Sequence, residues 1–195
     1  MQSRYFAAAV LPALLSVTSS PSATAPRAAA PTARVMSFDW PPRHSEKDAD
    51  VARTIASFKK ADPTMESFFT KSAGYAVFPT VAKGAIGIGA AHGDGEVLQA
   101  GTVIGTTTVT QVTIGAQLGG QEYSEIIFFE TPESRDSFKS GHFTFAAQAS
   151  AVAVTAGASA NAGYNNAVAV FTRAKGGLMY EASVGGQKFT YKPRE

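Results

Sequence analysis

The stretch from Lys83 to Leu98, KGAIGIGAAHGDGEVL, holds five glycines and could form a loop that binds phosphate. Such a loop points backbone N–H groups at the anion and is followed by a helix N-terminus. The pattern Gly87-x-Gly89 is followed by Gly93, one residue too late for a dinucleotide fingerprint, and no Gly-Lys-Ser/Thr triplet is present. Isoleucine and glycine alternate here with the period of a strand, and Asp94-Gly95 favours a two-residue turn. We therefore predict a β-hairpin that turns at Asp94-Gly95, and no nucleotide site.

The glycines of this stretch also predict how it packs. Glycine inside a strand marks a bulge, a sharp bend or the close approach of another backbone. We therefore expect Gly87 and Gly89 to lie where a neighbouring segment is close. A larger side chain there would overpack the interior.

The side chains that could perform catalysis are scattered along the chain. No two of the three histidines stand four residues apart, so the sequence has no helical metal-binding pair. His92 and Asp94 could hold a metal, but a polar turn is the more common explanation, and Ser140 lacks the sharp turn that presents a hydrolase nucleophile. Glu122 and Glu125 could act as an acid–base pair, but a solvated strand edge is the simpler interpretation. We therefore expect no enzyme, no metal site and no cofactor.

The charges are distributed unevenly. The net charge is +2, yet residues 45–195 carry 13 basic and 14 acidic side chains, which argues against a broadly basic surface for nucleic acid. From Arg173 to Arg194 there are five basic residues and one acidic residue, Glu181. The sequence therefore predicts a local basic patch near the C-terminus.

The elements that would position these residues follow from the apolar pattern. Residues 45–60 predict a helix with one apolar stripe, and Asp62-Pro63 predicts the start of a second helix. A third short helix is expected at 131–141. Between and after the helices we expect β-strands, with turns at Lys-Gly, Asp-Gly and Gly-Gly pairs. The expected strands are 75–82, 85–91, 96–104, 106–118, 122–130, 143–157, 167–173, 178–184 and 187–192. The predicted fold class is α+β, with a mostly antiparallel, curved or barrel-like sheet and an N-terminal helical pair.

The N-terminal segment is typical of a targeting sequence. Arg4 precedes an apolar run of 13 residues, Tyr5–Val17, and small residues follow it. We expect residues 1–25 to be a signal peptide and residues 26–44 to be a linker rich in proline and alanine. Export to the periplasm or outside the cell is the expectation. An organellar transit peptide is the alternative, because no acidic residue precedes Asp39.

Several motifs in the same order resemble the SYLF domain family. They are GYAVFP (74–79), KGAIGIGAAHGDGEV (83–97), QLGGQEYSEIIFF (117–129), FTFAAQASA (143–151) and AKGGLMYEASVGGQKFTY (174–191). The resemblance spans about residues 45–192, and the predicted domain is 45–195. It implies lipid binding, of phosphoinositides in particular, and actin binding in fungal members. Eukaryotic members often carry an SH3 domain, which this sequence lacks.

From the charge imbalance and the resemblance we predict a non-enzymatic module that binds anionic phospholipid at a membrane surface. A structural or protein-interaction module, with actin as the partner that the resemblance implies, is the alternative. An exposed face of Phe58 or Phe68 would add apolar contact. The basic residues that we expect to contact headgroups are Lys83, Arg173, Lys175, Lys188, Lys192, Lys59 and Lys60.

Each of these basic residues also has an ordinary explanation. Lys59 and Lys60 complement the dipole at a helix C-terminus, and Lys83 is a soluble residue at a turn, as is Lys175. If Gly185-Gly186 is a turn, Lys188 and Lys192 form a cross-strand ladder with Glu181.

Overall fold

The computed structural model describes residues 43–141, 144–145 and 151–195. The predicted signal peptide (1–25) and nearly all of the predicted linker (26–44) lie outside the described residues, as does part of the expected strand 143–157. The first described helix begins at Arg43, two residues before the predicted start of the domain.

Three helical elements open the described chain. They are α1 (Arg43–Ala61), the 3-10 helix η1 (Pro63–Met65) and α2 (Glu66–Lys71). The predicted N-cap is confirmed, because the side chain of Asp62 accepts from the backbone N–H of Thr64 (3.0 Å). It also accepts from the N–H of Ser159 (2.7 Å), at the start of a second 3-10 helix, η3 (Ala158–Asn161). Burial raises the pKa of Asp62, but these hydrogen bonds outweigh it and hold the pKa well below the usual range.

The predicted mid-chain helix is confirmed as α3 (Pro132–Lys139). Thr131 accepts from the backbone N–H of Ser134, and the hydroxyl of Ser134 accepts from the N–H of Thr131. This reciprocal capping satisfies two backbone donors at the start of the helix. Proline at the first helical position fits the same start.

The sheet is built from three unusually long strands. These are β1 (Gly74–Gln99), β2 (Thr102–Phe129) and β5 (Val168–Pro193), of 26, 28 and 26 residues. They pair antiparallel in the order β1-β2-β5. The short strands β3 (Thr144–Phe145) and β4 (Ala151–Ala153) join the free edge of β5, antiparallel and parallel respectively. The α+β fold class with a curved sheet is confirmed, and the sheet is open.

The predicted turns at glycine pairs are wrong. Asp94-Gly95, Gly119-Gly120 and Gly185-Gly186 all lie inside continuous strands, as do both Lys-Gly pairs. The turn between β1 and β2 is Ala100-Gly101, where both residues have positive φ (48° and 79°). Because Gly185-Gly186 is no turn, the expected ladder of Lys188 and Lys192 with Glu181 lacks its geometric basis.

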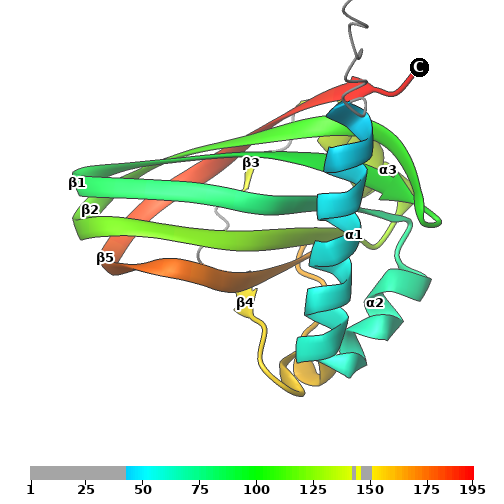
Figure 1. The fold of residues 1–195 in the computed structure, drawn as a ribbon, viewed down its shortest axis with the longest axis horizontal. Helices are drawn as coiled ribbons and strands as arrows, with labels where there is room; N and C mark the ends of the chain where they lie inside the picture. Colours follow the sequence, from blue (N-terminus) through cyan, green and yellow to red (C-terminus); the bar gives the residue numbers. More distant parts are fainter. Residues whose placement is uncertain (1–42, 142–143, 146–150) are drawn as a thin grey trace, which may run out of the picture. The chain divides into compact units, whose positions relative to one another are not determined.

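The glycines bend the strands instead of ending them. A Cβ on Gly93 would lie 2.7 Å from the carbonyl oxygen of Thr80, and a Cβ on Gly95 would clash with that of Val77. The two halves of β1 therefore lie against each other, and the three long strands turn back together at the left of Figure 1. We call residues 83–89, 113–119 and 178–185 the bend.

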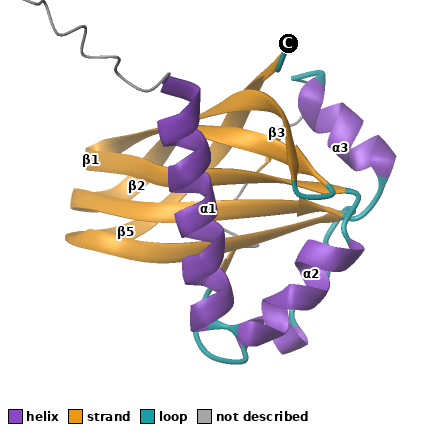
Figure 2. Cartoon of the chain, turned by 45° about the vertical axis from the view of Figure 1, so that its right-hand side comes forward, coloured by secondary structure: helices purple, strands orange, loops and turns teal. Residues whose placement is uncertain are grey.

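The folded sheet forms two layers. The near layer, beneath α1 and α2, comprises residues 74–82, 120–129 and 168–177. The far layer comprises residues 90–99, 102–112 and 186–193. Figure 2 shows α1 lying across the strands, with α2 and α3 toward the end opposite the bend.

Alternate residues of the near layer serve two hydrophobic cores. Phe128 and Phe171 point outward and pack with Phe58 and Phe68 of the helices. Phe78 and Phe129 point inward, between the layers, where Phe189 and α3 close the second core. The near layer is therefore buried on both faces at this end.

Candidate functional site: the bend and the cavity behind it

The outer surface of the bend, together with the adjoining Val112 of the far layer, exposes a group of large aliphatic side chains. We call them the bend patch: Ile86, Ile88, Val112, Ile114 and Leu118, which are 56–84% exposed. Ile86 pairs with Leu118, and Ile88 pairs with Ile114, across β1 and β2. Cross-strand partners lie on the same face of a sheet, so these side chains form one surface. Contiguous exposed apolar surface on a soluble domain marks a binding site for protein or membrane.

The inside of the bend explains why these side chains point outward. A Cβ on Gly89 would clash with Thr113 and lie 2.7 Å from Oε1 of Gln117. Thr113 donates to that oxygen (2.8 Å), and Nε2 of Gln117 donates to the carbonyl oxygens of Thr113 and Gly87 (both 3.0 Å). The concave side is therefore filled by small residues and a hydrogen-bonded amide, which leaves no room for isoleucine.

The two glycines singled out in the sequence have different roles. The expectation of close packing is confirmed for Gly89 and is wrong for Gly87, where an added Cβ would meet nothing within 4 Å. Gly87 has φ of +72°, so its backbone conformation, and not packing, requires glycine there.

The bend holds only two charged residues, Lys83 and Glu181. Segments 84–91 and 112–120 contain no Asp, Glu, Lys or Arg, and 176–187 contains only Glu181. Lysine borders the first segment at Lys83 and the last at both ends, Lys175 and Lys188. An apolar surface with few charges, and with the exposed Lys175 and Lys188 near its border, is suited to a membrane interface.

The predicted headgroup residues do not gather into one patch. Lys175 is exposed beside the bend and donates to the hydroxyl of Thr80 (2.7 Å) and the carbonyl oxygen of Pro79 (3.3 Å). Arg173 is exposed on the near layer, on the face shared with Phe171. Lys188 and Lys192 are exposed on the outer face of the far layer, opposite the buried Phe189.

The remaining predicted basic residues have local partners or surroundings. Lys59 pairs with Glu66 (2.9 Å) and lies 4.7 Å from the ring centre of Phe69, while Lys60 lies at the end of α1. Lys83 is only 5% exposed and lines a cavity between the layers. Phe58 and Phe68 are buried in the outer core, so they offer no exposed apolar face.

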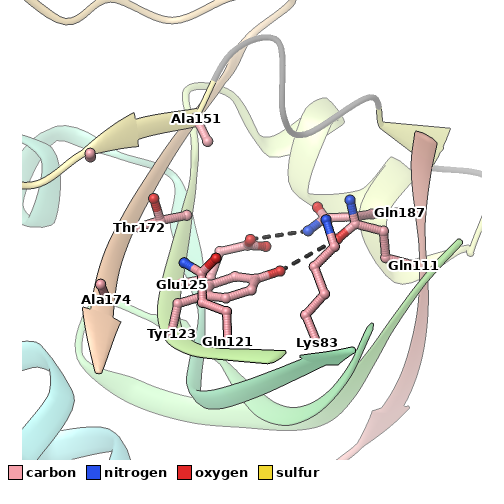
Figure 3. Close-up of a pocket in the computed structure, with 10 residues that line it drawn as sticks. Lys83, Gln111, Gln121, Tyr123, Glu125, Ala151, Thr172, Ala174 and Gln187 are labelled. Atoms are coloured by element: carbon pink, nitrogen blue, oxygen red, sulfur yellow. Dashed lines mark hydrogen bonds between the residues drawn. The ribbon is translucent and has the colours of Figure 1, made fainter. Parts of the chain in front are cut away.

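A polar cavity of about 290 Å³ lies between the two layers, next to β5. β3 pairs with the far half of β5, and β4 pairs with its near half. Residues of β2, β4 and β5 line the cavity, together with Lys83 of β1. Nε2 of Gln187 donates to Oε2 of Glu125 (3.0 Å), and the hydroxyl of Tyr123 donates to Oε1 of Gln111 (3.4 Å), as Figure 3 shows.

Glu125 is the ionisable centre of this cavity. The interpretation of Glu122 and Glu125 as a solvated edge holds for Glu122, which is exposed, and is wrong for Glu125, which is 1% exposed. Burial raises the pKa of Glu125 to about 7, against the opposing effect of the Gln187 hydrogen bond. The sequence pattern does not indicate this burial, because it favours a turn at Gly119-Gly120. The strand instead continues through this pair, and Glu125 faces the interior of the folded sheet.

The described residues contain no candidate for a metal site or for a membrane-spanning helix. Within the residues that the structure describes, no three His, Asp or Glu side chains gather closely enough to hold a metal ion. None of the described helices has both the length and the apolar composition needed to cross a membrane.

The fold defines a class of protein: a β-rich α+β domain whose folded sheet is covered by helices on one face. The family model Ysc84, described as "Las17-binding protein actin regulator", matches residues 110–195. This match covers less than half of the chain and supports the resemblance to the SYLF family over residues 110–195. It includes β5, most of β2 and the cavity residues that these two strands supply, and it is shorter than the span suggested by the motifs. No curated protein matches the chain.

Proposed function

We propose that this domain binds the surface of anionic membranes by inserting the bend patch among the lipids. Five exposed aliphatic side chains on the outer surface of the bend carry this proposal. Aliphatic side chains without neighbouring carboxylates enter the acyl boundary at low cost, whereas charged groups do not.

Lysines at the border of the bend supply the preference for anionic lipid. Lys175 and Lys188 stand shortly before and after the third segment of the bend, on different layers. A membrane that receives the bend patch would meet both layers at their common end. Arg173 and Lys192 lie further from the bend and would contribute at longer range.

The magnitudes favour reversible binding. Complete burial of an isoleucine, leucine or valine side chain contributes about 1.5–3 kcal/mol, and each basic residue near an anionic surface contributes about 1 kcal/mol. Association costs about 4–15 kcal/mol. The patch and the lysines are therefore both needed, and binding should weaken as salt screens the charges.

Co-sedimentation with vesicles tests both contributions. One vesicle contains phosphatidylcholine alone, and the other contains phosphatidylcholine with phosphatidylserine. We expect the full chain to sediment with the anionic vesicle, and the double variant Ile86→Thr/Ile114→Thr to lose most of that binding. Thr190→Ser, on the exposed face of the far layer, is the control. Binding by the double variant equal to that of the wild type would contradict insertion.

A charge reversal separates electrostatic attraction from insertion. The variant Lys175→Glu/Lys188→Glu should leave the anionic vesicle at physiological salt while keeping its melting temperature. Lys71→Glu, an exposed lysine at the end of α2, makes the same chemical change away from the bend and should bind normally. Equal binding of the wild type to neutral and anionic vesicles would argue against the lysines.

A protein-interaction module is the second candidate, because the matching family is described as an actin regulator. An exposed aliphatic surface also suits a protein partner. Co-sedimentation with filamentous actin, without lipid, distinguishes the two functions. Pelleting with actin, combined with no binding to either vesicle, would favour the protein partner.

Export is proposed on residues 1–25 alone. Mass spectrometry of the protein from its own cells would then find an N-terminus after the apolar run Tyr5–Val17. An intact Met1 in a cytosolic fraction would contradict export.

A further inference from the structure

We propose that the cavity between the layers binds a small neutral polyol, between glycerol and a hexose in size. The cavity lies inside the folded sheet, whereas the bend patch covers its outer surface. Binding in the cavity is therefore independent of membrane insertion. Its volume of about 290 Å³ is at the lower limit of small-molecule sites, which span about 300–1,000 Å³.

Three buried side chains converge on this space with atoms that have no hydrogen-bond partner. Gln111, Glu125 and Gln187 are each 1% exposed. Nε2 of Gln111, Oε1 of Glu125 and Oε1 of Gln187 are buried and unpartnered. Figure 3 shows these side chains pointing toward one another from β2 and from the far half of β5. Buried polar atoms are nearly always satisfied in native proteins, so these three atoms indicate a missing partner.

The unpartnered atoms specify the chemistry of that partner. The amide of Gln111 offers a donor, and the oxygens of Gln187 and Glu125 offer acceptors. A hydroxyl group both donates and accepts, so a molecule with neighbouring hydroxyls can satisfy all three atoms. Ala151, Ala153 and Ala174 also line the cavity and would contact the C–H groups of such a molecule.

The charges of the cavity favour a neutral ligand. The ammonium group of Lys83 and the carboxyl group of Glu125 both line it. Above pH 7, where Glu125 is mostly ionised because its pKa is about 7, an anion would meet the carboxylate, and a cation would meet the ammonium group. A neutral polyol avoids both repulsions.

NMR titration of the full chain tests this proposal at the cavity itself. The probes are glycerol and D-glucose, with D-glucosamine and D-glucose 6-phosphate as charged counterparts of the same ring. At pH 8, where Glu125 is mostly ionised, we expect saturable shifts of the side-chain amide signals of Gln111 and Gln187 with glucose, at millimolar affinity, and weaker binding of both charged sugars. Absence of saturable shifts would mean that water alone fills the cavity, and would overturn the proposal. Tighter binding of either charged sugar would overturn the neutral class.

Variants locate the site. Gln187→Leu and Gln111→Leu should each weaken glucose binding by about tenfold, since each leaves hydroxyls unpaired. Gln99→Leu makes the same change at an exposed position of β1 and should bind normally. Two leucine variants are used because one of them could fail to fold, which a melting curve would reveal. Unchanged affinity in either folded variant would contradict binding in this cavity.

A nearly isosteric change tests the charge balance. Glu125→Gln keeps the shape of the cavity and removes its negative charge, while the positive charge of Lys83 stays. It should still bind glucose and should gain affinity for glucose 6-phosphate. No gain for the phosphate ester would contradict the balance that we assign to these two groups.

Discussion

The same three strands end in two very different surroundings. At the helix end, Phe128 and Phe129 face α2 and α3 respectively, and the near layer is buried on both faces. At the bend, Ile114 and Leu118 of the same strand β2 are more than half exposed. Both ends are apolar in composition, and only one of them is covered by described elements.

This difference separates two uses of apolar residues. At the helix end, the centroid of the Phe128 ring lies 4.9–5.8 Å from the centroids of four other aromatic rings. These distances are expected of a packed core. The bend patch is aliphatic and has its side chains in solvent. Its apolar character therefore adds little to folding, and binding is the simpler explanation for it.

The largest expected effect lies at the helix end. Phe128→Ala removes a fully buried ring that contacts Phe68, Phe69, Tyr75 and Phe171. We expect a loss of about 3–5 kcal/mol in the free energy of unfolding, from lost transfer and a residual cavity. Urea unfolding monitored by circular dichroism measures it. A loss below about 1 kcal/mol would mean that the helices cover the near layer only loosely.

The second expected effect is a pH dependence of stability, which arises from Glu125 between the two ends of the sheet. The pKa of Glu125 is raised from 4.5 to about 7, so the folded protein keeps a proton that the unfolded chain releases in that window. Stability should therefore fall as pH rises from about 4.5 to about 7 and then level off. A shift of this size corresponds to up to about 3 kcal/mol.

Glu125→Gln should remove this part of the pH dependence. Glu96 contributes to the same window, because burial, followed by neighbouring Asp48, raises its pKa to about 7, and it is retained in the variant. Glu122→Gln on the exposed side of the strand is the control and should change nothing. Urea unfolding at pH 5 and pH 8 measures how much the free energy of unfolding changes between these two pH values. The same change in Glu125→Gln and in the wild type would show that Glu125 is not buried as described.

Local signals in the sequence predict the helices better than the strands. Asp62-Pro63 and Thr131-Pro132 start helices by short-range capping, which depends on a few adjacent residues. The glycine pairs resemble turns because a turn and a bend need the same backbone freedom. Only the contact between distant halves of β1 decides between them, and single-sequence patterns contain no such information.

The candidate site is predictable only in part. The alternation of Ile86 and Ile88 with glycine predicts a strand with side chains on one face only. It does not predict that these isoleucines are exposed to solvent. Lys83 is expected as an exposed headgroup residue, and the fold of the sheet buries it beside Glu125. The exposure of the isoleucines and the burial of Lys83 both depend on how the two layers pack against each other. That packing joins residues far apart in the sequence.

A smaller effect is expected inside the bend. Gly89→Val would place a branched side chain against Thr113, Gln117 and the Cβ of Ala85, the last at 3.0 Å. We expect a loss of about 1–3 kcal/mol through overpacking, reduced where the glutamine side chain can move. Equilibrium unfolding checks the size of the loss. Normal stability together with loss of nucleotide binding would instead revive a phosphate-loop interpretation of this stretch.

The smallest effect is expected on the outer surface of the bend. Ile86→Thr and Ile114→Thr keep β-branched side chains, which suit strands, and remove apolar groups that already lie in water. Each should change the free energy of unfolding by less than about 0.5 kcal/mol, the usual range for surface substitutions. Urea unfolding of the two single variants, beside Phe128→Ala in the same strand β2 as Ile114, measures the contrast directly. A loss above about 1 kcal/mol at either isoleucine would show that the bend patch is covered in solution, for example by a second copy of the chain, and concentration-dependent stability would then identify that cover.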